Sequence, residues 1–126
     1  MPNREKLGVD DRALEFVCEV IRFIRTIPAD PGIAELSAQL VGAAGSIGAN
    51  RAEGSGGSSR AEFRRFNEIA LRSAKETVFW LRVCQRSRLG DLQGNEALLD
   101  EAQQITRILA AVVLTAKRNS RRTPAA

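Results

Sequence analysis

The chain contains no proline between residues 32 and 123. Its four prolines are Pro2, Pro28, Pro31 and Pro124. Proline removes a backbone hydrogen bond and clashes with the preceding helical turn, so this long segment is free to be helical. Apolar residues recur at three- and four-residue steps along the chain, and no long stretch alternates with a period of two. The sequence therefore predicts an all-α protein.

The apolar spacing predicts four helices in a single domain covering residues 1–126. We expect the helices at about 10–27, 32–53, 59–88 and 95–118, followed by a flexible tail at about 119–126. Short connections favour antiparallel neighbours, so the expected architecture is an up-down-up-down four-helix bundle. In the first helix, the residues expected on the buried face are Leu14, Val17, Ile21 and Ile24.

The fourth expected helix is apolar on more than one side. Its main stripe consists of Leu98, Ala102, Ile105, Leu109, Val112 and Ala116. Off that stripe lie Leu99, Ile108, Val113 and Leu114. A helix that is apolar on more than one side needs more cover than its own bundle provides. We therefore expect the chain to self-associate.

The residue types argue against enzymatic activity. The chain has no histidine and only two cysteines, Cys18 and Cys84, so no ligand set for zinc, haem or an iron–sulfur cluster is expected. Both cysteines fall among apolar positions, where a free thiol behaves as a small hydrophobe. Glu53 and Glu76 have no nucleophile or histidine to accompany them as a catalytic pair. We expect no catalytic residues, no metal and no cofactor.

The N-terminal residues, MPNREKLGVDD, lack the long apolar core of a signal peptide. The longest apolar run, at residues 108–114, is too short to span a membrane. These features predict a cytoplasmic protein without a membrane partner.

Charge is unevenly distributed along a chain whose net charge is +4. Residues 51–88 hold 9 basic and 4 acidic residues, and residues 107–126 hold 5 basic residues and no acidic one. Between them, residues 89–106 hold 4 acidic residues and no basic one. A positive surface results if folding brings the two basic blocks together.

The stretch GSGGSSR, residues 54–60, lies between two expected helices. A phosphate-binding P-loop needs a lysine followed by Ser or Thr after a strand, and this stretch has neither the lysine nor the strand. A linker between domains is also disfavoured, because neither half can bury its own core. We interpret it as a turn, in which Gly54 stops the second helix in a left-handed conformation. Ser59 and Glu62 then form a capping box for the third helix.

Polar residues flank this turn at helical spacing. They are Ser46, Asn50 and Glu53 before it and Arg72, Ser73 and Glu76 after it. Buried polar groups are costly unless they are hydrogen-bonded. We therefore expect these six residues to form an interhelical network that fixes the register of the second and third helices.

The run SIGANRAEGSGGSSRAEFRRFNEIALRSAKE resembles the signature of bacterial four-helix bundle proteins first noticed as reading frames within intervening sequences of 23S rRNA genes. The matching residues of its first half are Ser46, Ile47, Asn50, Ala52, Glu53 and Gly54. Those of its second half are Glu62, Phe63, Arg65, Phe66, Ile69, Ala70, Ser73 and Glu76. The preceding pair Gln39 and Leu40 also matches. The sequence departs from the signature at Val41, Gly42, Arg51 and Arg72.

The resemblance implies a non-enzymatic protein assembled as a homopentameric barrel. Similar proteins include the accessory variability determinant of diversity-generating retroelements, which has a basic surface, binds nucleic acid and engages a reverse transcriptase. By this resemblance we expect an accessory factor that binds RNA or DNA. The alternative is a protein-interaction scaffold for a larger partner, such as a polymerase or reverse transcriptase, that does not itself bind nucleic acid. The acidic block within residues 89–106 and the doubly apolar fourth helix favour this alternative.

Basic side chains are the candidates for phosphate binding, because they neutralise phosphates without reading sequence. The nucleic-acid-binding candidates are Arg60, Arg64, Arg65, Arg82, Arg86, Lys117, Arg118, Arg121 and Arg122. Against this function, the chain has no tyrosine, and we expect little exposed aromatic surface on which bases can stack.

Overall fold

A computed structural model describes residues 6–56 and 59–122, which form an all-α fold without strands in that part of the chain. The helices are α1 (Val9–Ile24), α2 (Pro31–Ser55), α3 (Arg60–Arg86) and α4 (Leu92–Arg122). The all-α fold with four helices confirms the prediction. Helix α4 extends further in both directions than expected, so residues 119–122, assigned to a flexible tail, are helical. Residues 123–126 lie outside the described residues.

Side chains just before three of the helices satisfy backbone amides that the first helical turn leaves unpaired. Asp30 accepts a hydrogen bond from the amide of Gly32 at 2.7 Å, and Pro31 occupies the first turn of α2. The hydroxyl of Ser59 accepts from the amide of Glu62 at 3.1 Å, so Ser59 is the N-cap of α3. Before α4, a carboxylate oxygen of Asp91 accepts from the amide of Gly94 at 2.7 Å.

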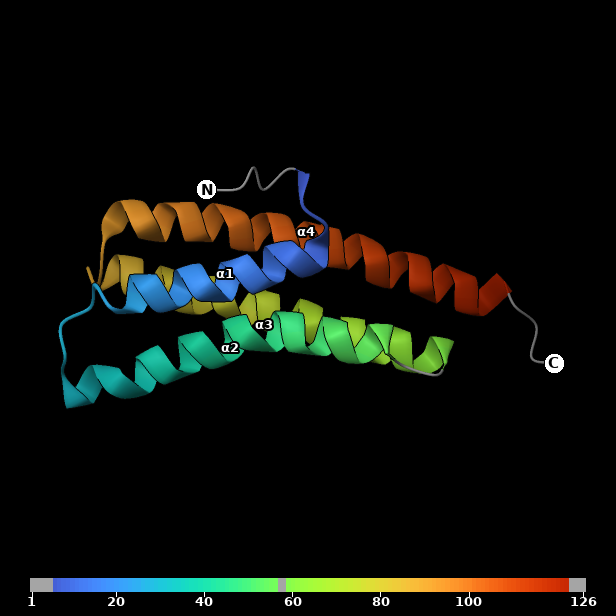
Figure 1. The fold of residues 1–126 in the computed structure, drawn as a ribbon, viewed down its shortest axis with the longest axis horizontal. Helices are drawn as coiled ribbons and strands as arrows, with labels where there is room; N and C mark the ends of the chain where they lie inside the picture. The colour runs from blue at the N-terminus through green and yellow to red at the C-terminus, as the bar shows by residue number, and fades with distance from the viewer. Residues whose placement is uncertain (1–5, 57–58, 123–126) are drawn as a thin grey trace.

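The helices lie side by side along the long axis of the molecule (Figure 1). Helix α3 packs against α2 and α4, and α1 packs against the same two helices. The core between them is mainly apolar and includes residues from every helix. Its largest fully buried apolar side chains are Phe16, Val20, Leu40, Ile47, Leu81, Cys84, Ile105 and Leu109.

Helix α1 turns a different apolar stripe into the core from the one its spacing indicated, although Val17 and Ile24 of the expected stripe are partly buried and pack against the core. Its buried apolar residues are Ala13, Phe16, Val20 and Phe23. Leu14 and Ile21, expected in the core, are instead 60% and 39% exposed. Both sets of residues repeat at helical spacing, so α1 has two apolar stripes. The core takes the stripe with the two phenylalanines, because aromatic rings bury more apolar area.

Gly54 permits a close approach of α2 and α3. It was expected to end α2 in a left-handed conformation, but α2 continues through Ser55, and Gly54 is buried inside the helix. A Cβ atom at this position would lie 3.2 Å from the Cβ of Phe66 and 3.3 Å from Nδ2 of Asn67. The expectation was wrong because glycine serves helix packing here, rather than a positive φ.

We predict opposite effects from two glycine substitutions in α2. Gly54→Val should lower the free energy of unfolding by about 1–3 kcal/mol, because its side chain collides with α3. Gly42 is exposed, and a Cβ there meets nothing within 4 Å. Gly42→Ala should therefore raise the free energy by about 0.5–1 kcal/mol through helix propensity. Urea unfolding followed by circular dichroism measures both, and equal effects would contradict the packing role of Gly54.

A buried ion pair ties α1 to α4. Nε of Arg12 donates to Oε2 of Glu101 at 3.1 Å, and one of its Nη atoms donates to the other carboxylate oxygen. The same Nη atom donates to Oε1 of Gln104 at 2.9 Å. Arg12 and Glu101 are only 8% and 2% exposed. Two hydrogen bonds from the guanidinium to the carboxylate offset part of the cost of removing both charges from water.

Arg12→Met should destabilise the protein by about 3–5 kcal/mol, because Glu101 is left as a buried charge without its partner. The double variant Arg12→Met/Glu101→Leu should regain most of that loss, since it removes both charges and keeps apolar volume. Urea unfolding of both variants at one protein concentration tests this. A loss below about 1 kcal/mol in the single variant would show that solvent reaches Glu101.

Candidate nucleic-acid interface

Folding brings the start of α3 next to the end of α4. A hollow of about 570 Å³ is lined by Arg60, Arg64, Arg65 and Glu68 of α3 and by Ser120 of α4. We call this region the basic end. It places arginines of the first basic block beside the helix that carries the second block. The uneven charge distribution of the sequence therefore produces a cluster of arginines at one end of the molecule.

The arginines of the basic end differ in their contacts. Nε of Arg64 pairs with Oε1 of Glu68 at 2.9 Å, one helical turn away, and both side chains are about 40% exposed. The guanidinium of Arg65 lies 4.9 Å from the ring centre of Phe66. This cation–π contact leaves the guanidinium edge free to donate hydrogen bonds. An exposed pair such as Arg64–Glu68 contributes little to stability and can open to an anion.

The other basic candidates occupy two separate places. Lys117 and Arg118 lie on the last part of α4, three and two residues before Ser120. Arg121 and Arg122 continue the same helix, and their side chains lie outside the described part of the structure. Arg82 and Arg86 are exposed near the far end of α3, roughly 33 Å and 39 Å from Arg60 at 1.5 Å per residue. The structure therefore does not gather the nine candidates into one patch.

A second cationic cluster lies between the second half of α3 and the middle of α4. A hollow of about 370 Å³ is lined by Lys75, Val78 and Arg82 of α3 and by Gln103, Thr106 and Arg107 of α4. We call Lys75, Arg82 and Arg107 the cation triad. Sequence reasoning missed Lys75 and Arg107. Lys75 and Arg82 are seven residues apart and so share a helix face, but Arg107 joins them only through the packing of α3 on α4.

Aromatic surface is more exposed than the sequence suggested. Phe79 is 57% exposed on α3. Its ring makes an edge-to-face contact with Trp80, with the ring centres 5.0 Å apart. The expectation of little exposed aromatic surface rested on the low aromatic content of the chain. It failed because the hydrophobic repeat of α3 passes through Trp80 and leaves its neighbour Phe79 outside the core.

Three carboxylates of the acidic block have partners within the chain. Glu101 pairs with Arg12, Asp100 accepts a hydrogen bond from Gln104 at 2.8 Å, and Asp91 caps the first turn of α4. Glu96 is exposed. These carboxylates serve helix ends and helix packing, and none of them lines the hollow of the cation triad.

The polar residues beside the turn form a smaller network than expected. Nδ2 of Asn50 donates to the hydroxyl and the carbonyl oxygen of Ser46, both at 2.8 Å. The hydroxyl of Ser73 donates to that of Ser46, also at 2.8 Å, and so links α3 to α2. The other three expected members, Glu53, Arg72 and Glu76, are exposed and stay outside this network. Glu76 instead accepts a hydrogen bond from Nε1 of Trp80 on its own helix, at 3.4 Å.

Arg51 forms a further polar link that sequence reasoning missed. Its Nε donates to Asp10 of α1 at 2.9 Å, and its Nη1 donates to Oδ1 of the fully buried Asn67 of α3 at 2.7 Å. Nδ2 of Asn67 in turn donates to the carbonyl oxygen of Phe63. The departure from the family signature at Arg51 therefore joins α1, α2 and α3.

The environment of Cys84 does not favour thiol chemistry. Both cysteines are free, and Cys84 is fully buried. Burial raises the pKa of the Cys84 thiol above its ordinary value, because the thiolate would lose its hydration. A raised pKa lowers the fraction of reactive thiolate at neutral pH, so Cys84 acts as a core residue.

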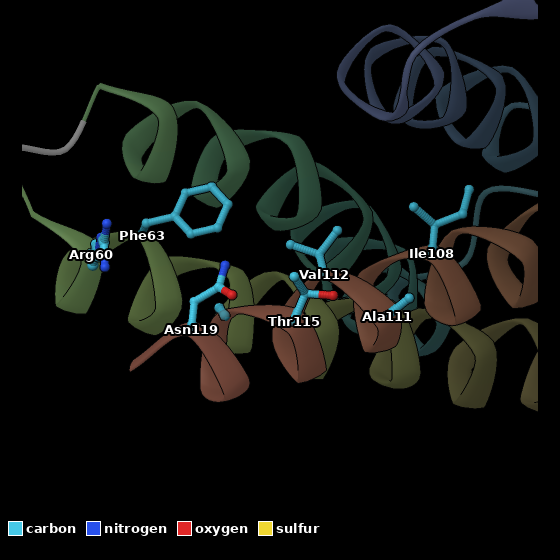
Figure 2. Close-up of a pocket in the computed structure, with 8 residues that line it drawn as sticks. Arg60, Phe63, Ile108, Ala111, Val112, Thr115 and Asn119 are labelled. Carbon is cyan, nitrogen blue, oxygen red and sulfur yellow. The ribbon is translucent and has the colours of Figure 1, made fainter. Parts of the chain in front are cut away.

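An apolar groove of about 910 Å³ opens between the start of α3 and the second half of α4 (Figure 2). Its apolar lining is Phe63, Ile108, Ala111, Val112 and Ala116, with Arg60, Thr115 and Asn119 completing it. Figure 2 shows the α4 residues in a row, with Phe63 and Arg60 near one end. Ile108, an off-stripe residue of α4, lies in this groove, and Leu114 is 49% exposed. Val113, expected off the core stripe, is buried.

The groove exists because α1 is shorter than α4. Helix α1 has 16 residues and α4 has 31. Arg12, in the first turn of α1, already contacts Glu101 and Gln104, so within the described residues α1 does not run beside α4 from Ile108 onward. Figure 1 shows the last part of α4 extending past α1.

Comparisons with known proteins agree with this fold of four helices. The model of the 23S rRNA-intervening sequence protein family matches residues 5–111, and the chain belongs to this family. It is similar to the crystal structure of a protein of unknown function from the S23 ribosomal protein family of Bacteroides thetaiotaomicron. The two are 27% identical with a TM-score of 0.77, over 84% of this chain and 98% of that one. The search of curated proteins found no match.

Within the described residues, no helix has the length and apolar character needed to cross a membrane.

Proposed function

We propose that this protein is a non-enzymatic accessory factor that binds the phosphates of RNA or DNA through basic surface residues. The observation that carries the proposal is the basic end, where Arg60, Arg64 and Arg65 meet the last turns of α4. Lys117 and Arg118 lie on those turns, and Arg121 and Arg122 follow them. Clustered arginine and lysine side chains bind phosphates electrostatically, without reading base sequence.

The wild-type protein should bind fluorescent RNA and DNA oligonucleotides with an affinity that falls steeply as salt increases, because binding releases counterions. Arg60→Ala/Arg64→Ala should weaken binding and lower the slope of log affinity against log salt by about 1–2. Fluorescence anisotropy across a salt series measures both quantities.

The matched control is Arg22→Ala/Arg25→Ala, which removes the same charge from exposed positions on and just after α1. Equal losses in the two double variants would show that net charge alone, rather than the basic end, controls binding. No binding at low salt by a folded wild-type protein would contradict the proposal. The protein-interaction scaffold would then become the working function.

We also propose that the bundle is antiparallel, up-down-up-down, and assembles into a closed ring, which the family resemblance suggests is a homopentamer. Two uncovered apolar features support assembly: the ridge of Leu14 and Ile21 on α1, and the apolar groove between α3 and α4. A ridge and a groove at different places on one chain favour head-to-tail contacts. Such contacts produce rings when the rotation between copies closes.

Val112→Asp should reduce the mass of the assembly in solution, because it places an unpaired charge in the apolar groove. Thr115→Asp is the control for added charge, since Thr115 also lines the groove but is already polar and exposed. Light scattering coupled to size exclusion measures the mass. A wild-type protein that remains monomeric at all concentrations would contradict the assembly.

A further inference from the structure

We infer that the cation triad and Phe79 form a binding site for single-stranded nucleic acid. In this site Lys75, Arg82 and Arg107 contact phosphates, while a base stacks on the ring of Phe79. The inference rests on the proposed function and goes beyond it: it names the form of nucleic acid and a site separate from the basic end. Two independent observations carry it, the electrostatics of the triad and the exposure of the ring.

No member of the cation triad pairs with a carboxylate in the described structure. Glu76, which follows Lys75 on α3, accepts a hydrogen bond from Trp80 instead. None of its three members makes a hydrogen bond or ion pair with a described residue, unlike Arg64, which pairs with Glu68. No acidic residue stands three or four positions from any of the three along its helix. Like charges gathered around one hollow repel each other, so an anion bound there removes an unfavourable interaction.

The lining of this hollow suits a phosphate group. Besides the three cations, the amide of Gln103 makes no hydrogen bond within the described residues and can donate one. The hydroxyl of Thr106 already donates to the carbonyl oxygen of Ala102 at 2.7 Å. No carboxylate lines the hollow. Arginine also offers two parallel donors that match the oxygens of a phosphate.

Phe79 stands next to two members of the triad on the surface of α3. It lies four residues after Lys75 and three before Arg82, and side chains at these spacings are neighbours on a helix. A ring that is 57% exposed between two cations has the arrangement of a single-strand site, in which bases stack on aromatic rings and cations follow the backbone. Bases of a duplex are already stacked, so a duplex cannot use the ring in this way.

The two basic sites lie along the same side of α3. The residues Arg60, Arg64, Lys75 and Arg82 are separated by four, eleven and seven residues, which keeps all four on the side of α3 beside α4. Arg64 and Lys75 are roughly 16 Å apart along the helix axis. A single strand that contacts both sites should bind more tightly than one that contacts either site alone. Binding at the first site raises the effective concentration of the strand at the second.

The first test uses a thymidine oligonucleotide of about 20 nucleotides, longer than common single-strand site sizes, and a duplex of the same length. Phe79→Leu keeps an apolar side chain but removes the stacking ring, so single-strand affinity should fall roughly 5- to 100-fold with an unchanged salt slope. Duplex affinity should stay the same. Lys75→Ala or Arg107→Ala should lower the single-strand salt slope by about 0.7.

The matched control is Leu92→Ala, which shortens another large exposed side chain, 58% exposed, at the start of α4. It should leave affinity unchanged. Trp80 gives a second readout, because it is the only tryptophan of the chain and its ring contacts Phe79. Its fluorescence should change when the thymidine oligonucleotide binds, and that change should shrink in Phe79→Leu.

The outcomes separate this inference from the proposed function. If the wild-type protein binds nucleic acid while Phe79→Leu and the triad variants bind it equally well, the inference is overturned and the basic end remains the binding site. If Phe79→Leu instead lowers the mass of the assembly, the ring is a contact between protein chains and the inference is again overturned. If no nucleic acid binds at low salt, both the inference and the proposed function fail.

Discussion

The ion pair between Arg12 and Glu101 is the interaction that organises this molecule. A guanidinium and a carboxylate removed from water must meet each other closely, and this requirement fixes the position of α1 along α4. The pair also engages Glu101, one of the carboxylates in the acidic segment between the two basic blocks. With Asp91 and Asp100 engaged in local hydrogen bonds as well, three carboxylates of that segment have partners other than the cation triad.

The position of α1 has a second consequence. Because its first turn already lies at the level of Glu101, the short helix leaves the later part of α4 without its cover. The apolar groove and the neighbouring basic end both lie in that uncovered part. One constraint thus produces two kinds of surface: an apolar one, where we propose that another copy of the chain docks, and a charged one, where we propose that phosphates bind. The two surfaces share Arg60, so assembly and binding are expected to influence each other.

The sequence predicted the four helices because proline placement and apolar spacing act locally, and it predicted the cap at Ser59 for the same reason. It could not choose between the two apolar stripes of α1, since that choice depends on which side chains fill the core. Gly54 was assigned to a turn because glycine is common both in turns and where helices pack closely. Only the position of Phe66 in the folded structure distinguishes the two roles. The cation triad could not be predicted, because it forms only where α3 packs against α4. Residue spacing within one helix does not show which residues of another helix lie beside it.

The most direct test of single-strand binding at the cation triad is photo-cross-linking of the protein to a single strand of 4-thiothymidine, with the attachment sites mapped by mass spectrometry. We predict attachment at Phe79 or Trp80, and loss of these cross-links at high salt as the phosphates leave the cation triad. Attachment confined to α1 or α2, or cross-links that do not respond to salt, would contradict it.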